Sequence, residues 1–363
     1  MKKNVVIITN YPIVYRDDLF NELSNSERIN FNYIFIPDKP STHKKAISNF
    51  ENKLFLKDSK FIETNRLSSI FKLFKVLKNK KQDIIIIGGF PIYFFSLIIH
   101  KLLFRSKIIV WWGGTNHSES SVSKIKNLVR KFFSLYLDGA IYYSKLSIVN
   151  LRNINKNIHR SFILGNNTRN SKLFNKKIEE ITVKNNKNEI ILLTIGFQIE
   201  RKNTIFILKN LNNIISDKKI TLYVLGDGSE LIKLKSFSKS HNLNVIFKGH
   251  VNQKDIYEYY KIADIFIHSS KLDQWPQTYT EAICSGLPVM ISSTSGVSDD
   301  LTNKYNSEII FDPNDGDEFV EKLQRLIDDV NLRKEIALDA KKLAFQNDGI
   351  SKAKDLIDFL STF

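Results

Sequence analysis

Two acidic residues eight positions apart, Asp273 and Glu281, carry the clearest chemical signal in the sequence. They flank Pro276, and the residues after this proline predict a helix that begins at Gln277. A helix start exposes unpaired amides, here those of Gln277 and Thr278, which favour a bound phosphate. A carboxylate accepts hydrogen bonds from the vicinal hydroxyls of a sugar or a ribose. Spacing alone does not distinguish such a site from a solvated helix start.

The surrounding residues resemble the donor motif of glycosyltransferase family 4, whose members have the GT-B fold. That motif has two acids separated by seven residues and then Ala-x-x-x-Gly-x-Pro-Val, which is matched here by Asp273, Glu281, Ala282, Gly286, Pro288 and Val289. Further stretches similar to the family's pattern are Pro12–Phe20, Asn167–Phe174, Gly196–Asn203, Leu225–Glu230 and Phe247–Val251. The resemblance covers most of the chain; it is specific in the second half and looser in the first.

The resemblance implies roles for individual residues of the second half. Arg201 and Lys202 would hold the donor diphosphate, Asp273 would contact the donor sugar ring, and we expect these three residues to act in catalysis. Glu281 would bind the ribose hydroxyls. The other substrate contacts expected in this half are Gly196, Gly226, Val251, Gln277 and Thr278.

The sequence departs from the family pattern at three positions. Asp273 replaces a glutamate, and Pro276 removes an amide that the family usually has. These two differences favour an altered donor choice over lost activity. Phe197 replaces an arginine, which leaves Arg201 and Lys202 to carry more of the phosphate charge.

In the first half, the loop Trp111–Glu119 follows an apolar strand and contains two glycines that permit close backbone approach. Family members often have a donor or acceptor contact near this strand end. We therefore expect His117 to act in catalysis and Asn116 to bind substrate. A purely structural loop histidine is the other interpretation of His117. Arg16, in the opening stretch that resembles one branch of the family, is the remaining expected substrate contact.

Short apolar runs alternate with helical patterns along the chain, as in parallel α/β sheets. The first series extends from Val5–Thr9 to Phe162–Leu164, and the second from Ile190–Ile195 to Ile309–Phe311. Together with the resemblance, this predicts an α/β chain of GT-B type, with two Rossmann-like domains and a deep interdomain cleft. The predicted parts are an acceptor-binding domain (1–165), a linker (166–188), a nucleotide-sugar-binding domain (189–345) and a C-terminal helix (346–363) that returns to the first domain.

Charge is unevenly distributed along the chain. Residues 1–165 contain 27 Lys or Arg and 11 Asp or Glu, a net of +16, whereas residues 166–363 contain 27 of each. The N-terminal half therefore predicts contact with an anionic surface, with compositional drift as the other interpretation. For a lipid-linked acceptor this surface would be a membrane, and the basic and apolar stretches Ile70–Lys78 and Lys124–Phe133 fit one. We expect no nucleic-acid partner, because no recognition helix or stacking motif occurs.

Composition narrows the protein class further. The single cysteine, Cys284, excludes a disulfide framework. The most apolar stretch, Ile84–Phe104, is interrupted by Gly, Pro, His and Lys, and no signal-peptide core follows Met1, so we expect a cytoplasmic protein, peripheral at the inner face of the cell membrane. We expect no metal and no cofactor other than the nucleotide sugar itself, which is a substrate.

The sequence thus predicts a hexosyltransferase that moves a sugar from a nucleotide sugar, such as a UDP-sugar, to a glycan or lipid-linked acceptor. The resemblance implies a retaining, metal-independent reaction in the synthesis of a bacterial surface polysaccharide, such as capsule or lipopolysaccharide. One alternative is a basic two-domain binding protein for an anionic polymer or nucleic acid, with an inactive sugar site. Another is a relative that isomerises or hydrolyses the nucleotide sugar without an acceptor.

Overall fold

A computed structural model of the chain describes residues 2–10, 16–37, 59–62, 68–79, 81–116, 118–165, 188–252, 255–300, 305–346 and 348–363. The chain divides into two compact units. Unit 1 consists of residues 1–170 and 347–363, and unit 2 consists of residues 171–346. The predicted linker, except for its last residue, and the family-like stretch Asn167–Phe174 lie outside the described residues.

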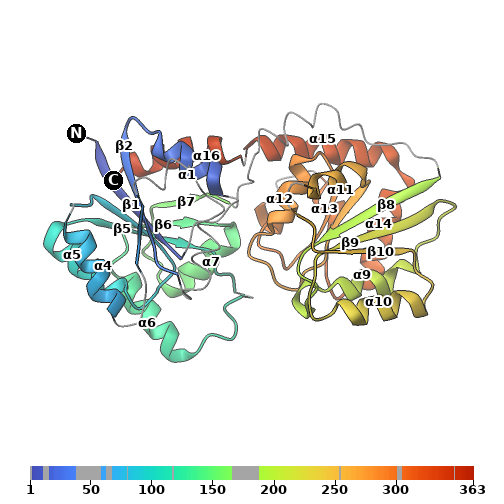
Figure 1. Ribbon diagram of the computed structural model, residues 1–363, viewed down its shortest axis with the longest axis horizontal. Helices are drawn as coiled ribbons and strands as arrows, with labels where there is room; N and C mark the ends of the chain where they lie inside the picture. The colour runs from blue at the N-terminus through green and yellow to red at the C-terminus, as the bar shows by residue number, and fades with distance from the viewer. Residues whose placement is uncertain are drawn as a thin grey trace. The chain divides into compact units, whose positions relative to one another are not determined.

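Unit 1 is built on a parallel sheet, with seven strands among the described residues (Figure 1). Their spatial order is β3 (Ser59–Phe61), β2 (Ile29–Phe35), β1 (Lys3–Thr9), β4 (Ile84–Gly88), β5 (Lys107–Trp112), β6 (Gly139–Tyr142) and β7 (Ser161–Ile163). Residues 84–87 of β4 are four consecutive buried isoleucines. Such an unbroken apolar run is typical of a central parallel strand, which is covered on both faces.

Helices cover both faces of this sheet. On one face α1 (Asp17–Ser24) packs beside α16 (Gly349–Ser361), which follows the last residues of unit 2 in the chain (Figure 1). Asp348 caps α16, since its Oδ1 accepts hydrogen bonds from the amides of Ile350 and Ser351 at 2.8 and 2.9 Å. Leu356 and Leu360 of α16 then join the buried cluster around Phe20 of α1.

The other helices of unit 1 follow its later strands. They are α4 (Ser68–Lys78), α5 (Phe94–Phe104), α6 (Lys124–Ser134) and α7 (Lys145–Ile154). Helices α4 and α5 pack together and bury Leu73, Leu77, Phe94 and Leu97 against the second face of the sheet. No helix in the described part of the chain is long and apolar enough to cross a membrane.

Unit 2 is a second parallel sheet, with six strands among the described residues. Their spatial order is β10 (Val245–Gly249), β9 (Lys219–Leu225), β8 (Glu189–Ile195), β11 (Ile265–His268), β12 (Val289–Ser292) and β13 (Ile310–Phe311). The helices that accompany them are α9 (Thr204–Leu211), α10 (Leu231–Ser240), α11 (Ile256–Ile262), α12 (Gln277–Cys284), α13 (Asn306–Ile309), α14 (Gly316–Asp328) and α15 (Val330–Gln346), with 3₁₀ turns η2 (Glu200–Lys202) and η3 (Ser298–Asp300).

Each sheet contains one point at which the strand order reverses, between β1 and β4 in unit 1 and between β8 and β11 in unit 2. Doubly wound sheets bind their ligands at this switch point, at the carboxyl ends of the two strands. The predicted α/β class with two Rossmann-like folds is therefore confirmed. In unit 2 the switch point lies between the strands that precede Gly196 and Asp273.

Candidate functional site

Three of the predicted catalytic residues meet at the switch point of unit 2. Arg201 and Lys202 lie in η2, shortly after β8, and Asp273 follows β11. The Nζ of Lys202 is 2.5 Å from Oδ2 of Asp273, and Nη1 of Arg201 is 3.9 Å from the same oxygen. Two cations and one carboxylate from loops about 70 positions apart in the sequence thus form a single cluster at the carboxyl ends of the central strands.

Backbone contacts hold the two loops of this cluster together. The hydroxyl of Ser269 donates to the carbonyls of Lys202 and Asn203, each at 3.1 Å, and the amide of Lys271 donates to the carbonyl of Arg201 at 2.9 Å. The guanidinium of Arg201 also donates to the carbonyl of Leu272. These bonds fix the cations beside Asp273 without relying on the ion pair itself.

His268, the last residue of β11, lies beside the carboxylate but is not a cation. Its Nε2 is 3.6 Å from Oδ2 of Asp273. Burial, together with the charge of Lys202, lowers the pKa of His268 to about 3, so its ring is neutral near pH 7. Burial opposes the ionisation of Asp273, but Lys202 and Arg201 outweigh it and hold the pKa of Asp273 below its usual value. The carboxylate is therefore ionised, and Lys202 is its main partner.

The two predicted glycine contacts explain how the neighbouring loops fit together. Gly226 follows β9 with a φ of +108°, and a Cβ atom there would lie 2.0 Å from the carbonyl oxygen of Gly196. A Cβ atom on Gly228 would similarly lie 2.2 Å from the carbonyl oxygen of Gln198. Only glycine permits this approach, which brings the ends of β8 and β9 into direct backbone contact.

The start of α12 presents unsatisfied polar groups, as its sequence predicted. The helix begins at Gln277, and Pro276 before it provides no side-chain cap. Within the described part of the chain the amides of Gln277 and Thr278 donate no hydrogen bond. Both polar atoms of the Gln277 side chain are also buried without a partner there. An anion or another polar ligand would satisfy these groups.

Glu281 has a different environment from Asp273. Its side chain is only 6% exposed, and its Oε2 accepts a hydrogen bond of 2.9 Å from the hydroxyl of Tyr260. Burial raises the pKa of Glu281 to about 7, and the Tyr260 bond opposes this rise only in part. The expected ribose contact of Glu281 stays a prediction.

Val251 lies just beyond β10, in a half-buried position. The preceding amide of His250 donates to Oδ2 of Asp227 at 3.0 Å, so Asp227 ties this loop to the loop after β9. A separate cavity of about 340 Å³ lies beside η2, between α9 and α10. None of the predicted site residues lines it; its polar lining includes Glu230, Lys233 and Lys271.

In unit 1 the structure places Arg16 in the interior, just before α1. Its guanidinium lies 4.2 Å from the ring centre of Trp111 and 5.5 Å from that of Tyr143, and it donates to the Tyr143 hydroxyl. The side chain is 5% exposed, which leaves little surface for a substrate. This arrangement indicates a packing role, and the expected substrate contact stays a prediction.

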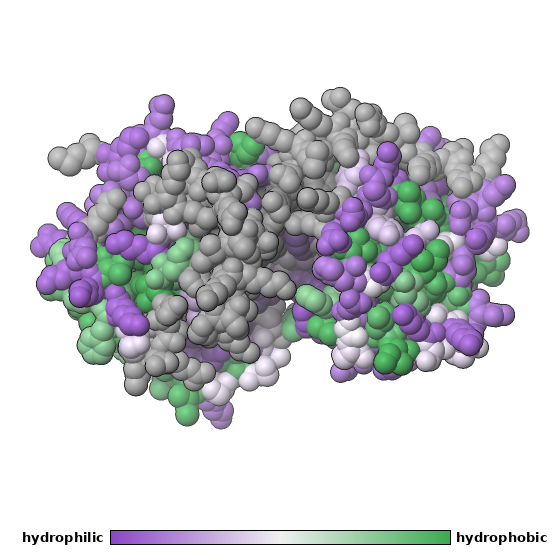
Figure 2. All heavy atoms as spheres, viewed as in Figure 1, coloured by the Kyte–Doolittle hydropathy of each residue, from purple (hydrophilic) through white to green (hydrophobic). Residues whose placement is uncertain are grey.

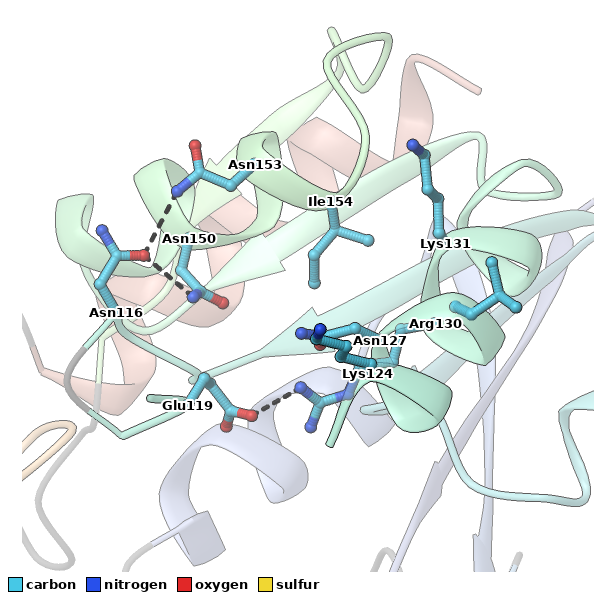
Figure 3. A pocket seen from close by; sticks show the side chains of 10 residues that line it. Asn116, Glu119, Lys124, Asn127, Arg130, Lys131, Asn150, Asn153 and Ile154 are labelled. Atoms are coloured by element: carbon cyan, nitrogen blue, oxygen red, sulfur yellow. Dashed lines mark hydrogen bonds and ion pairs between the residues drawn. The ribbon is translucent and has the colours of Figure 1, made fainter. Parts of the chain in front are cut away.

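Asn116 lies on the wall of a pocket of about 380 Å³ that is confined to unit 1 (Figure 3). Its Oδ1 accepts hydrogen bonds from the amides of Asn150 at 3.1 Å and Asn153 at 3.4 Å, and Trp112 donates to Asn150 at 3.1 Å. The complete lining is Asn116, Glu119, Lys124, Asn127, Leu128, Arg130, Lys131, Asn150, Asn153 and Ile154. His117, the expected neighbour of Asn116, lies outside the described residues.

The charges in this pocket are mostly positive. Glu119 is paired with Arg130 at 2.6 Å (Figure 3). The guanidinium of Arg130 also lies 5.0 Å from the ring centre of Trp112. Lys124 and Lys131 add two further cations to the lining. Amide groups donate and accept hydrogen bonds, as sugar hydroxyls do, and ammonium groups suit an anion. The pocket is therefore equipped for a polar, negatively charged ligand.

Sequence reasoning missed several residues of these sites. His268 could have been found, because it ends the strand directly before the acidic motif. The contacts of Tyr260 and of the side-chain amides of Asn150 and Asn153 have no local signal, because only tertiary packing brings these groups to Glu281 and Asn116.

The chain is similar to known proteins in sequence and in structure. Residues 175–343 match the family model described as glycosyl transferases group 1. Protein CapJ of Staphylococcus aureus is 28% identical over 194 residues, which cover 51% of this chain and 47% of CapJ. The chain thus spans about half the length of that curated relative.

Solved structures match over the full length. The apo form of the lipopolysaccharide outer core galactosyltransferase WaaB has a TM-score of 0.78 at 16% identity, with 99% of each chain covered. HepE of Anabaena, solved in complex with UDP, has a TM-score of 0.79 at 14% identity, with 100% of each chain covered. Likeness at these identities establishes a shared fold. Taken with the two switch points, it shows that the chain has the GT-B fold, and residues 175–343, just under half of the chain, match the group 1 glycosyltransferases.

Proposed function

We propose that the protein transfers a hexose from a nucleotide sugar to a glycan or lipid-linked acceptor, with retention of configuration and without a metal ion. The observation that carries this proposal is the cluster of Arg201, Lys202 and Asp273 at the switch point of unit 2. A nucleoside diphosphate leaving group carries about three negative charges, which must be stabilised in the transition state. Arg201 and Lys202 supply two positive charges, and the amides at the start of α12 supply further donors.

Asp273 is suited to orient the donor sugar. It is ionised, and its position is fixed by Lys202 before any substrate binds. A carboxylate held in this way accepts hydrogen bonds from sugar hydroxyls. The proposed division of labour therefore assigns the departing diphosphate to the two cations and the sugar ring to Asp273.

We propose UDP as the nucleotide and a surface polysaccharide, such as capsule or lipopolysaccharide, as the product. The first choice is supported by HepE, which was solved with UDP, and the second by the name of WaaB. Unit 2 would bind the donor, and the pocket around Asn116 in unit 1 would bind the acceptor, because its amides and cations match a sugar that carries a phosphate. We also propose a cytoplasmic protein, and the net charge of the N-terminal half supports action at an anionic membrane surface.

Ligand binding tests the donor site. Arg201→Ala removes one charge-assisted contact to the diphosphate, and Arg201→Ala/Lys202→Ala removes two, each worth about 1.5–3 kcal/mol. The double variant should bind UDP on the order of 100-fold more weakly or worse, while uridine binding changes little, as measured by calorimetry. The matched control is Lys235→Ala/Lys239→Ala, which removes two exposed cations from α10 of the same unit.

Three outcomes would contradict the proposal. Equal losses for UDP and uridine would show that the cations do not face the diphosphate. Loss of transferase activity in EDTA would refute the metal-independent reaction. A salt-sensitive complex with DNA or RNA, without any thermal shift in UDP, would favour the binding protein for anionic polymers. The single Arg201→Ala variant is the control for misfolding of the double variant, because it leaves the Lys202–Asp273 pair intact.

A further inference from the structure

Three consecutive helices of unit 1 expose apolar side chains to solvent. On α5 these are Phe95, Ile99, Leu102 and Leu103, and on α6 they are Ile125, Leu128, Val129 and Phe132, with Leu135 just beyond. Phe71 on α4 is also exposed. Figure 2 shows green, apolar spheres at the edge of unit 1 where α4 and α5 lie, and again at the end formed by α6.

The spacing of these residues is helical, but the stripe faces outward. On α6 the exposed apolar positions are i, i+3, i+4 and i+7, which form one continuous stripe. A helix that packs only within a globular unit turns such a stripe toward the core. Here the opposite side of α6 is buried instead, through Arg130, Phe133 and Ser134.

The exposed stripes form one surface rather than scattered residues. The ring centres of Phe95 on α5 and Phe132 on α6 are 6.5 Å apart, and Phe95 also meets Phe133 edge to face at 4.9 Å. Helix α4 is joined to α5 by a bond of 2.6 Å from the Ser96 hydroxyl to the carbonyl of Ile70. We name this surface, made of the outer sides of α4, α5 and α6, the apolar face.

The positive charge of α4, α5 and α6 indicates which kind of partner the apolar face would bind. Helices α4, α5 and α6 contain seven lysines and one arginine and no acidic residue. Lys101 and Arg130 are paired with Asp138 and Glu119, but the remaining six lysines are exposed: Lys72, Lys75, Lys78, Lys124, Lys126 and Lys131. A second copy of this chain would place lysines against lysines, so self-association through this face is disfavoured. An anionic surface with an apolar interior matches both properties.

We propose that the apolar face docks on the surface of an anionic lipid bilayer, with Leu102, Ile125 and their neighbours inserted below the head groups and the lysines at the level of the phosphates. Helices α5 and α6 have 11 residues each, about 16 Å at 1.5 Å per residue, so they suit an orientation along the interface. The purpose of this docking rests on the proposed function, because docking would bring a lipid-linked acceptor within reach of the protein.

The acceptor pocket borders the docking surface. Leu128 belongs to the exposed stripe of α6 and also lines the pocket. Lys124 and Lys131 of the same helix line the pocket as well (Figure 3). A lipid with its tail in the bilayer would therefore have its polar head beside Asn127 and Asn116. The membrane and the pocket would be in contact because α6 contributes to both the apolar face and the pocket lining.

Vesicle sedimentation tests the docking surface with the full-length protein. The wild type should bind vesicles of phosphatidylcholine with about 30% phosphatidylglycerol and leave pure phosphatidylcholine vesicles in the supernatant. Leu102→Ser/Ile125→Ser changes side chains that are 70% and 78% exposed, so the fold should persist, and partitioning should fall about tenfold or more. The matched control, Ile215→Ser/Ile232→Ser, changes residues of unit 2 that are 86% and 80% exposed and should bind as the wild type does.

Each result bears on the proposal separately from the donor site. Unchanged binding of the Leu102→Ser/Ile125→Ser variant, or equal losses in both double variants, would overturn it. A wild-type dimer in light scattering that this variant converts to monomer would assign the apolar face to a second copy instead. The thermal shift in UDP, measured on the same samples, reports on the donor site. Its absence in the wild type would refute the proposed function while leaving the vesicle result standing.

Discussion

The Lys202–Asp273 pair sets the electrostatics of the candidate site. Lys202 and Asp273 are both largely buried, and His268 beside them is neutral, so the pair is nearly balanced in charge. An incoming diphosphate would meet Arg201 as the more exposed cation and would compete with Asp273 for Lys202. In the proposed reaction, Lys202 would move from Asp273 to the diphosphate when the donor binds. An oxygen of the Asp273 carboxylate would then be free to accept a hydrogen bond from the sugar.

Glu281 introduces a pH dependence of a different kind. Its pKa in the folded protein is about 7, above the ordinary value of 4.5, because burial penalises the charged form. The folded state therefore holds a proton between pH 4.5 and 7 that the unfolded state has released. The free energy of unfolding that depends on this group is fully present below pH 4.5 and is lost as the pH rises through 7.

Replacing Glu281 by Gln should remove this dependence. The variant side chain keeps the shape of the protonated acid but does not ionise, so its stability relative to the wild type should rise as the pH increases from about 4.5 to about 8. A pKa change from 4.5 to about 7 corresponds to on the order of 3 kcal/mol. Urea unfolding at about pH 5 and about pH 8 measures the difference, with Glu258→Gln on the exposed side of α11 as the control. Parallel pH profiles for the two variants would show that Glu281 is not titrating abnormally.

The two loops after β8 and β9 depend on glycine where their backbones meet. Gly226 combines a positive φ with a carbonyl 2.0 Å from the position of a Cβ atom, so alanine there is disfavoured both by conformation and by space. Gly286 also has a positive φ, +69°, but nothing lies within 4 Å of the place that a Cβ atom would take. Substitution at Gly286 therefore measures backbone strain alone, whereas substitution at Gly226 measures backbone strain together with steric overlap.

Gly226→Ala should destabilise unit 2 far more than Gly286→Ala. The left-handed conformation alone costs about 1–2 kcal/mol, and overpacking adds about 1–3 kcal/mol at Gly226 only. Because the displaced loop carries Gly196 and leads to Arg201, UDP binding should fall with it. Thermal unfolding and UDP titration of both variants measure these effects. Equal losses of stability would mean that the contact between the two loops is not rigid.

Across the whole molecule, the positive charge is carried by the N-terminal sequence, and therefore by the unit that contains α4, α5 and α6. Unit 2 is almost neutral in comparison, because acidic residues balance its lysines and arginines. Long-range attraction to an anionic surface should consequently orient the protein with unit 1 foremost. The apolar face and the charge asymmetry would then act in sequence, first to attract and then to insert.

Reversing charge on one unit at a time tests this orientation. Lys72→Glu/Lys75→Glu/Lys78→Glu changes the charge of α4 by six units, and it should abolish binding to vesicles with about 30% phosphatidylglycerol while leaving the UDP thermal shift intact. Lys209→Glu/Lys235→Glu/Lys239→Glu makes the same change on unit 2 and should bind nearly as the wild type does. Wild-type binding should also weaken between about 0.05 and 0.5 M salt, as the screening length falls from over about 10 Å to a few. Equal losses of vesicle binding in the two triple variants would show that binding depends only on the net charge of the protein and not on the position of the lysines.

Local sequence patterns were enough to predict most of the helices and strands and the chemical types of the residues at the site. Buried parallel strands are apolar at nearly every position, so apolar runs such as Ile84–Ile87 and Ile265–His268 are sufficient to predict these strands. The motif from Asp273 to Val289 likewise identified the helix start and the two acids. The short strand β3 escaped prediction because it lies at the sheet edge and contains Ser59 and Lys60, which carry no apolar signal.

Which residues face one another depends on how the strands and helices pack. The Lys202–Asp273 pair joins positions 71 apart, and it exists because β8 and β11 are neighbours in the sheet, an order that no local pattern encodes. The bond between Tyr260 and Glu281, the amides around Asn116 and the outward turn of the α6 stripe have the same origin. Periodicity reports that a helix has an apolar side, but whether that side meets a core or solvent depends on how the chain packs, because the hydrophobic effect has no direction of its own.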